Sequence, residues 1–78
     1  MKTEIVRKRM LKNRQIVYLR YFLIRINNTY GVRIVYKDEK YELLLNKPKK
    51  KVIEIIGILA KELTFPLELK YILEDNEL

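Results

Sequence analysis

The residue types that carry most enzyme chemistry are missing from these 78 residues, because the chain has no His and no Cys. The usual general base at neutral pH, the thiolate nucleophile and the commonest zinc ligands are therefore absent. Carboxylates remain, but Asp38, Glu39 and Glu42 surround a turn signal and the others, apart from Glu4, lie in the C-terminal third, outside any apolar pattern that would tune a pair for acid–base work. The sequence predicts no catalytic residue, no metal site, no cofactor and no small-molecule ligand. We expect a binding protein, not an enzyme.

Basic side chains are the residues best suited to binding. The chain has 17 Lys and Arg against 10 Asp and Glu, a net charge of +7. Residues 1–51 hold 15 basic and 4 acidic side chains, whereas residues 52–78 hold 2 basic and 6 acidic ones. This asymmetry indicates either a basic surface for nucleic acid or an acidic partner, or two halves whose charges balance each other within the fold.

A run of lysines precedes the predicted helical region and includes Lys49, Lys50 and Lys51. Cations at a helix start and anions at a helix end both oppose the helix dipole. The chain has both, because it closes on Glu74, Asp75 and Glu77. If two helices run antiparallel, the two clusters would neutralise each other. The alternative is that the three lysines bind phosphate or acidic groups.

The elements that would position these side chains follow from the hydrophobic pattern. Strands are predicted over residues 4–11, 15–26, 30–37 and 40–45, separated by short turn signals that require antiparallel hairpins. From residue 47 the apolar spacing becomes helical, with Val52, Ile55, Ile56, Leu59 and Leu63 as one stripe. A second helix starts at Pro66. Gly57 is expected where helix backbone approaches the sheet. We predict one α+β domain over residues 1–78, a β-meander (1–46) with a helical hairpin (47–78) packed on one sheet face, in the order ββββαα.

The hairpin loops decide which side chains face those helices, because a one-residue slip reverses the two faces of a strand. A three-residue loop over residues 27–29 places Phe22 opposite Ile34 and avoids placing it opposite Arg33. A turn centred on Asp38 and Glu39 places Tyr36 opposite Tyr41. The register of the first hairpin is ambiguous, because either register leaves a Lys or Arg of the first strand beside Arg20. The predicted helix-facing set is Tyr18, Phe22, Ile24, Ile26, Tyr30, Val32, Ile34, Tyr36, Tyr41, Leu43 and Leu45.

The remaining apolar side chains of the sheet form a second face that no predicted helix covers. This patch consists of Val17, Leu19, Tyr21, Leu23 and Val35, and it is bordered by Arg25, Arg33 and Lys37. Monomers rarely expose a large contiguous apolar patch, so a homodimer or another protein partner is the leading interpretation. Nucleic acid bound by the arginines, or coverage by the N-terminal segment, are the alternatives.

A helix-turn-helix interpretation of residues 52–75 is disfavoured. Its recognition helix would carry Glu68, Glu74 and Asp75 against a single Lys70, which is the wrong sign for DNA.

Several short motifs carry a family resemblance. They are Tyr30-Gly31 at a strand start, Leu59-Ala60 in the amphipathic helix, the junction Thr64-Phe65-Pro66, and Leu69 followed by Glu74-Asp75. Over about residues 16–76 the chain resembles a family of small bacterial proteins known as domain of unknown function 6514. The resemblance implies a bacterial, cytosolic protein and no assigned activity.

The start of the chain is charged and the sequence contains no apolar run of 18 residues, so we expect a cytoplasmic protein without a membrane segment. Taken together, the sequence predicts a small non-catalytic interaction module, homodimeric or adaptor-like. The alternative is a nucleic-acid-binding protein that uses an Arg-rich sheet face.

Overall fold

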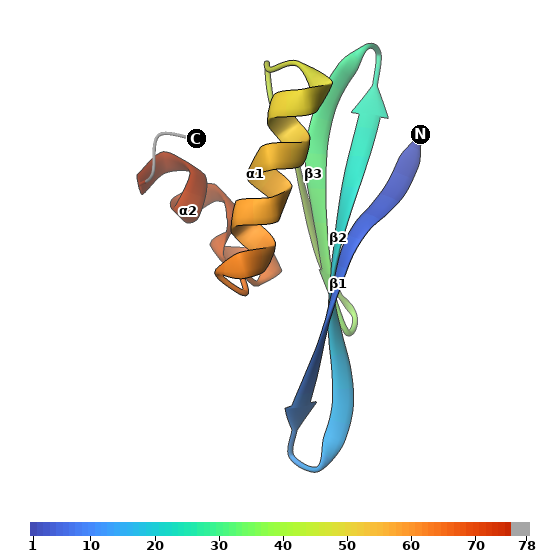
Figure 1. Cartoon of the computed structure of the whole chain (residues 1–78), viewed down its shortest axis with the longest axis vertical. Coiled ribbons are helices and arrows are strands. Elements are labelled where there is room, and N and C mark those ends of the chain that lie inside the picture. Colours follow the sequence, from blue (N-terminus) through green and yellow to red (C-terminus); the bar gives the residue numbers. More distant parts are fainter. Residues whose placement is uncertain (76–78) are drawn as a thin grey trace.

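A four-stranded antiparallel sheet followed by two helices makes up the fold (Figure 1). The computed structural model describes residues 1–75, apart from the side chain of Asp75. The strands are β1 (Lys2–Lys12), β2 (Gln15–Ile26), β3 (Thr29–Tyr36) and β4 (Glu39–Leu44), and they neighbour one another in chain order. They are followed by α1 (Lys49–Lys61), a short 3-10 helix η1 (Pro66–Glu68) and α2 (Leu69–Asp75). The predicted α+β meander with a helical hairpin is confirmed.

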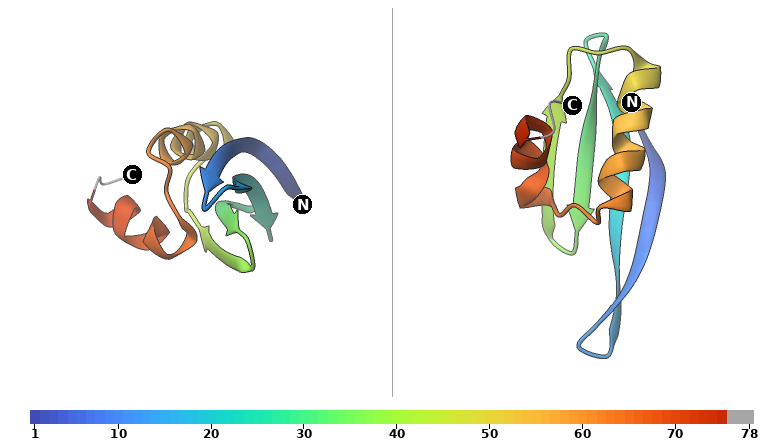
Figure 2. Two further views of the ribbon diagram at one scale, coloured as in Figure 1. Left: turned by 90° about the horizontal axis from the view of Figure 1, so that it is seen from below. Right: turned by 60° about the vertical axis from the view of Figure 1, so that its left-hand side comes forward.

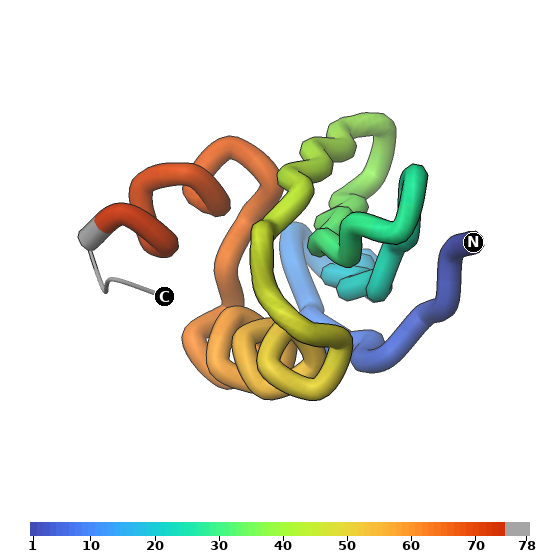
Figure 3. The backbone as a smooth tube through the Cα atoms, turned by 90° about the horizontal axis from the view of Figure 1, so that it is seen from above, coloured from blue at the N-terminus to red at the C-terminus, as the bar shows by residue number. Residues whose placement is uncertain are grey.

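Both helices pack on the same face of the sheet, as predicted. Helix α1 lies over β1, β2 and β3, while η1 and α2 lie over β3 and β4 (Figures 2 and 3). A single cluster of buried apolar side chains joins sheet and helices. From α1 it receives the predicted stripe residues Val52, Ile55, Ile56 and Leu59, and from α2 it receives Leu69 and Leu73.

The hairpin between β2 and β3 has a two-residue turn, so the predicted three-residue loop is wrong. Ile26 pairs with Thr29, and Asn27 and Asn28 have φ values of 50° and 65°. Two consecutive positive φ angles characterise the type I′ turn, whose twist matches that of paired strands and which favours Asn. The β1–β2 turn is built in the same way, with φ values of 51° at Asn13 and 65° at Arg14.

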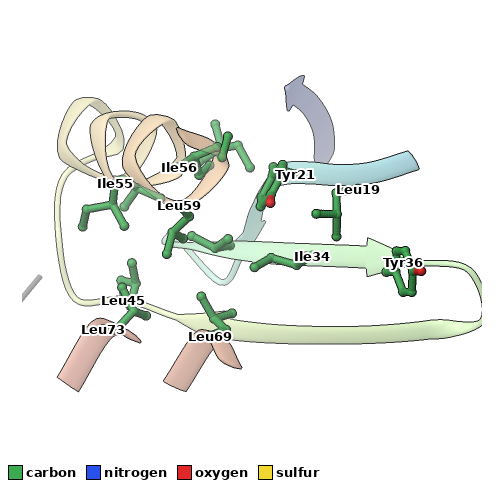
Figure 4. Close-up of a cluster of buried hydrophobic side chains, with 14 residues drawn as sticks. Leu19, Tyr21, Ile34, Tyr36, Leu45, Ile55, Ile56, Leu59, Leu69 and Leu73 are labelled. Carbon is green, nitrogen blue, oxygen red and sulfur yellow. The ribbon is translucent and has the colours of Figure 1, made fainter. Parts of the chain in front are cut away.

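This turn reverses the two faces of β2 relative to the prediction. Leu23 pairs with Val32, Tyr21 with Ile34 and Leu19 with Tyr36, and all of these side chains belong to the core beneath the helices. Figure 4 shows Leu19, Tyr21, Ile34 and Tyr36 in this cluster. Val17 packs partly buried against the same core, whereas Val35 lies on the opposite face beside Arg20. The predicted apolar interface is therefore wrong. Three of its members are the centre of the core, and its five residues do not share one face.

Strand β2 is apolar on both sides because its second face is buried without a helix. Phe22 and Ile24 are only 4% and 2% exposed. The ammonium of Lys2 and the guanidinium of Arg20 lie 5.1 and 4.9 Å from the centre of the Phe22 ring. Long basic side chains can cover apolar surface with their stems and keep their charges in water. No second molecule is needed to explain the pattern.

The β3–β4 turn is also shorter than predicted. Tyr36 pairs with Glu39, and Ile34 with Tyr41, so the register differs by two residues from the expected pairing of Tyr36 with Tyr41. An even shift leaves the faces unchanged. Leu43 and Leu45 therefore still face the core, as predicted.

Helix α1 does not approach the sheet through Gly57, contrary to prediction. A Cβ added at Gly57 would meet no atom within 4 Å. The close approach occurs at Gly31 instead, where an added Cβ would lie 2.4 Å from the Leu43 carbonyl oxygen on the neighbouring strand.

Candidate nucleic-acid interface

The sheet face turned away from the helices, called the outer face below, is predominantly basic. Strand alternation and the observed register assign its charged residues. Basic groups outnumber acidic ones by six to two: Lys2, Arg7, Arg9, Arg20, Arg33 and Lys40 against Glu4 and Glu42. The face therefore carries an excess of positive charge.

Two carboxylates hold part of this surface in place. Glu4 accepts hydrogen bonds from Arg7 at 3.0 Å and from Arg20 at 2.7 Å, and these bonds lower the pKa of Glu4. Glu42 accepts a hydrogen bond from Arg33 at 2.6 Å. That ion pair explains why Phe22 can pair with Arg33, the arrangement that the sequence interpretation rejected. The carboxylates orient three arginines but neutralise only part of their charge.

The far end of the β1–β2 hairpin extends beyond the rest of the molecule (Figures 1 and 2). Residues 9–18, called the arm below, form four cross-strand pairs from Arg9 with Tyr18 to Lys12 with Gln15. The pairing of β2 with β3 begins only at Leu19, so within residues 1–75 the arm is a two-stranded ribbon. It contains Arg9, Lys12 and Arg14 and no acidic residue.

The arm also exposes apolar groups on its outer side. Leu11 and Ile16 pair with each other across the ribbon and are 76% and 50% exposed. Tyr18, opposite Arg9, is 41% exposed, and the guanidinium of Arg7 lies 5.4 Å from its ring centre. An isolated two-stranded ribbon is marginally stable in water. Leu11 and Ile16 lie outside the core cluster, whereas Met10 and Val17 on the other side of the arm pack against it.

A pocket of about 370 Å3 lies at the base of the arm, beside the β3–β4 turn. It is lined by Lys12, Tyr36, Lys37, Asp38 and Glu39. The ammonium groups of Lys12 and Lys37 lie 5.7 and 5.5 Å from the centre of the Tyr36 ring. Two cations thus gather around one aromatic ring at this corner.

The basic residues singled out from the sequence are not gathered at one site. Arg33 lies on the outer face, but Arg25 lies on the other face, opposite Tyr30, where its guanidinium bonds the side chain of Asn28. Lys37 lies in the turn and lines the pocket. The expectation that Arg25 and Arg33 border one patch is wrong, because the β2 register is reversed.

The lysines at the start of α1 face solvent. Lys51 forms an ion pair with Glu54 on its own helix at 3.8 Å, and Lys49 and Lys50 are exposed. Within the described part of the chain, no ion pair links these lysines to Glu74. Glu77 and the side chain of Asp75 lie outside the described residues, so the predicted neutralisation involving them stays a prediction.

Sequence reasoning missed the most exposed part of the interface. The sequence alone does not assign the arm and the basic residues of β1 to a face, because the register of the first hairpin is ambiguous. A signal was present in the stretch from Arg7 to Arg14, which has five cations in eight residues and no acid. Such a density in a predicted hairpin indicates a solvated or ligand-facing ribbon.

One buried polar contact couples the sheet to the helices. The Tyr21 hydroxyl donates a hydrogen bond of 2.9 Å to the Thr64 carbonyl oxygen, between α1 and η1. Burial, with a further contribution from Glu68, raises the pKa of Tyr21 to about 12. A phenol that stays protonated and hydrogen-bonded to a backbone carbonyl serves the fold.

Comparisons with protein-family models, curated proteins and solved structures found no match. The resemblance to domain of unknown function 6514 stays a prediction. Among residues 1–75, no group of His, Cys, Asp and Glu side chains could hold a metal ion, and no helix is both long and apolar enough to cross a membrane.

Proposed function

We propose that this protein is a small non-catalytic module that binds nucleic acid through its basic outer face and arm. The proposal includes a cytoplasmic location, where such a ligand is available. The observation that supports this proposal most is the arm. It is a ribbon that extends beyond the body of the fold, with three cations, no acidic residue and exposed apolar groups, and ligand binding explains this combination better than packing does. Phosphates supply the opposite charge in a regular array.

The outer face supports the same ligand. Its basic groups adjoin the arm, because Arg7 and Arg20 form the last outward-facing cross-strand pair before the arm begins at Arg9. The surplus of positive charge therefore continues from β3 across β2 and along β1 to the tip. A continuous basic surface attracts a polyanion over its whole length and accelerates encounter.

The homodimer, the leading sequence interpretation, loses its basis. Leu19, Tyr21 and Leu23, which formed the centre of its proposed interface, are 0%, 0% and 2% exposed within one chain. An acidic protein partner would also fit a basic surface, and it would differ from nucleic acid in showing no response to oligonucleotides.

The test compares two charge-reversal variants with the same change in net charge. Arg9→Glu/Arg14→Glu alters the arm, and Lys50→Glu/Lys61→Glu alters exposed positions of α1. Binding of a fluorescent 20-mer, double- or single-stranded, is followed by anisotropy at low salt, with circular dichroism as the control for folding. We expect the arm variant to bind at least about tenfold more weakly than the α1 variant, because phosphate contacts dominate such affinities. Equal losses in the two variants, or no binding by the wild type, would contradict the proposal.

A further inference from the structure

We propose, as a refinement that rests on this function, that the ligand is B-form double-stranded DNA and that the arm enters its major groove. The major groove of B-DNA is about 12 Å wide and about 8.5 Å deep, and it admits a two-stranded β-ribbon. The three steps from the Arg9–Tyr18 pair to the Lys12–Gln15 pair span about 10 Å at roughly 3.4 Å per residue, and the turn lies beyond them. Met10 and Val17 pack against the core on the helix side of the arm, and the arm is long enough for its outer side and its turn to reach the floor of the groove.

The side chains of the arm suit a groove floor. The tip presents Arg14 in the turn and Gln15 beside it, whereas the ammonium of Lys12 is turned back over the rings of Tyr36 and Phe65. Arg and Gln donate hydrogen bonds to purine edges in the major groove, and exposed aliphatic groups such as Leu11 and Ile16 can contact the thymine methyl group. The ribbon thus combines donors and apolar contacts on a frame that carries no negative charge.

The outer face is poorly suited to single strands. Single-stranded binders stack bases on exposed aromatic rings. Phe22 is buried beneath Lys2 and Arg20, so it offers no free ring face. Tyr18 is half exposed, but Arg7 already lies over its ring. The surface offers cations without a stacking platform.

Double-stranded RNA fits less well than DNA. Its A-form major groove is deep and too narrow for side chains to read, and its accessible minor groove is shallow. A protruding ribbon matches a wide groove better than a shallow one. The two lysines beside Tyr36 lie at the base of the arm, where the phosphates that border the groove would pass.

The experiment uses the full chain and three 20-mer probes of one sequence: duplex DNA, duplex RNA and single-stranded DNA. We expect duplex DNA to bind at least about tenfold more tightly than the other two at equal salt. Methyl green, which occupies the major groove, should displace the protein from DNA, and distamycin, which fills the minor groove, should not. Single-stranded DNA binding as tightly as duplex DNA, or displacement by distamycin alone, would overturn the inference.

An arm-shortened variant separates this inference from the proposed function. Residues 11–16 are replaced by Asn-Gly, which closes a two-residue turn on the Met10 and Val17 pair, a pair of the same hydrogen-bonding type as Lys12 with Gln15. The fold should persist, because Met10 and Val17 keep their places against the core and none of the removed side chains belongs to the core cluster. We expect the variant to keep weak binding to all three probes and to lose the preference for duplex DNA. If the wild type binds all probes equally, the groove inference fails and the proposed function stands; if it binds none, the proposed function itself fails.

Discussion

Tyr21 is the residue of β2 whose side chain couples the sheet to the helices by a hydrogen bond. A strand that is apolar on both sides can turn either face inward, but only one face carries a phenol at a position that reaches the α1–η1 junction. Its hydroxyl satisfies the Thr64 carbonyl, and its ring is fully buried. A hydrogen bond of this kind contributes modestly when made, but leaving a buried partner unpaired is costly.

Tyr21→Phe should destabilise the protein by about 1 kcal/mol at pH 8, since it removes the partner of that carbonyl. The wild type should also lose stability at alkaline pH. Because folding raises the pKa of Tyr21 from 10.0 to about 12, the neutral phenol is favoured in the folded state. Its contribution is complete below pH 10 and is lost as the pH rises towards 12. Urea unfolding at pH 8 and pH 11 measures both effects.

Tyr71→Phe is the control for Tyr21→Phe, because Tyr71 is 65% exposed. It should leave the free energy of unfolding and its alkaline decline unchanged. If Tyr21→Phe behaves like this control, Tyr21 does not bond the helix junction.

The two glycines should respond in opposite ways to substitution by Ala. At Gly31 a new Cβ would lie 2.4 Å from the Leu43 carbonyl oxygen and 2.8 Å from the Leu44 Cα, both backbone atoms that cannot move aside easily. Gly31→Ala should therefore destabilise the protein by about 1–3 kcal/mol, as overpacking does. Gly57→Ala meets nothing within 4 Å in the middle of α1, and it should stabilise by up to about 1 kcal/mol. Thermal unfolding of both variants shows whether each substitution lowers or raises the melting temperature. Equal changes in the two variants would contradict the assignment of the close approach to Gly31.

At the scale of elements, the sequence was sufficient for the order of strands and helices and for the face of each helix. The helical stripe through Val52, Ile55 and Leu59 has one period and one apolar side, so only one face of this helix can be buried against the sheet. Strand β2 leaves a choice, because Phe22 and Ile24 are as apolar as Leu19 and Leu23. The sequence interpretation turns the wrong face of β2 inward, because the pairing of Phe22 with Arg33 is unfavourable when the side chains of the neighbouring strands are ignored.

The sequence pattern does not show that side chains of the neighbouring strands stabilise the pairing of Phe22 with Arg33. Arg33 bonds Glu42 on β4, and Lys2 from β1 covers Phe22. Such contacts depend on a register that must be known first. The basic candidates for the site were affected in the same way, because the face that each Arg occupies follows from the β2–β3 turn.

The turn itself can be tested by substitution at Asn28, which has a φ of 65°. Asn28→Gly should be neutral or stabilise slightly, because Gly adopts this conformation without strain. Asn28→Val should destabilise by about 1–2 kcal/mol, since a side chain branched at Cβ is strained at positive φ. Chemical unfolding of the two variants distinguishes a type I′ turn from the longer loop, in which Asn28→Val would be tolerated.

Leu19, Tyr21 and Leu23, the centre of the predicted dimer interface, belong to the core of a single chain. We therefore expect a monomer in analytical ultracentrifugation. Leu19→Glu/Leu23→Glu should unfold the chain, because it places two charges in fully buried positions. Leu11→Glu/Ile16→Glu changes the same number of apolar residues on the arm and should leave a folded monomer. A folded, monomeric Leu19→Glu/Leu23→Glu variant of a dimeric wild type would restore the original interface.

The charge distribution over the molecule leads to the central claim. The outer face and the arm carry eight basic residues against two acidic ones, whereas α1, η1 and α2 on the other side of the sheet carry five basic residues against four acidic ones. A polyanion should therefore approach from the outer face and arm. The number of phosphates that the protein contacts can be measured from the salt dependence of the affinity.

The most direct test is the affinity for a 20-bp DNA duplex measured by anisotropy from about 25 to 200 mM salt. For a protein that contacts several phosphates, the logarithm of the affinity falls linearly with the logarithm of the salt concentration, with a slope of about −0.9 per phosphate. We predict such a line for the wild type, and a slope smaller in magnitude by about 1 after Arg9→Ala, which removes one phosphate-contacting cation from the arm. Lys61→Ala on α1 should leave the slope unchanged. Binding that does not depend on salt, or no binding at 25 mM, would contradict the account.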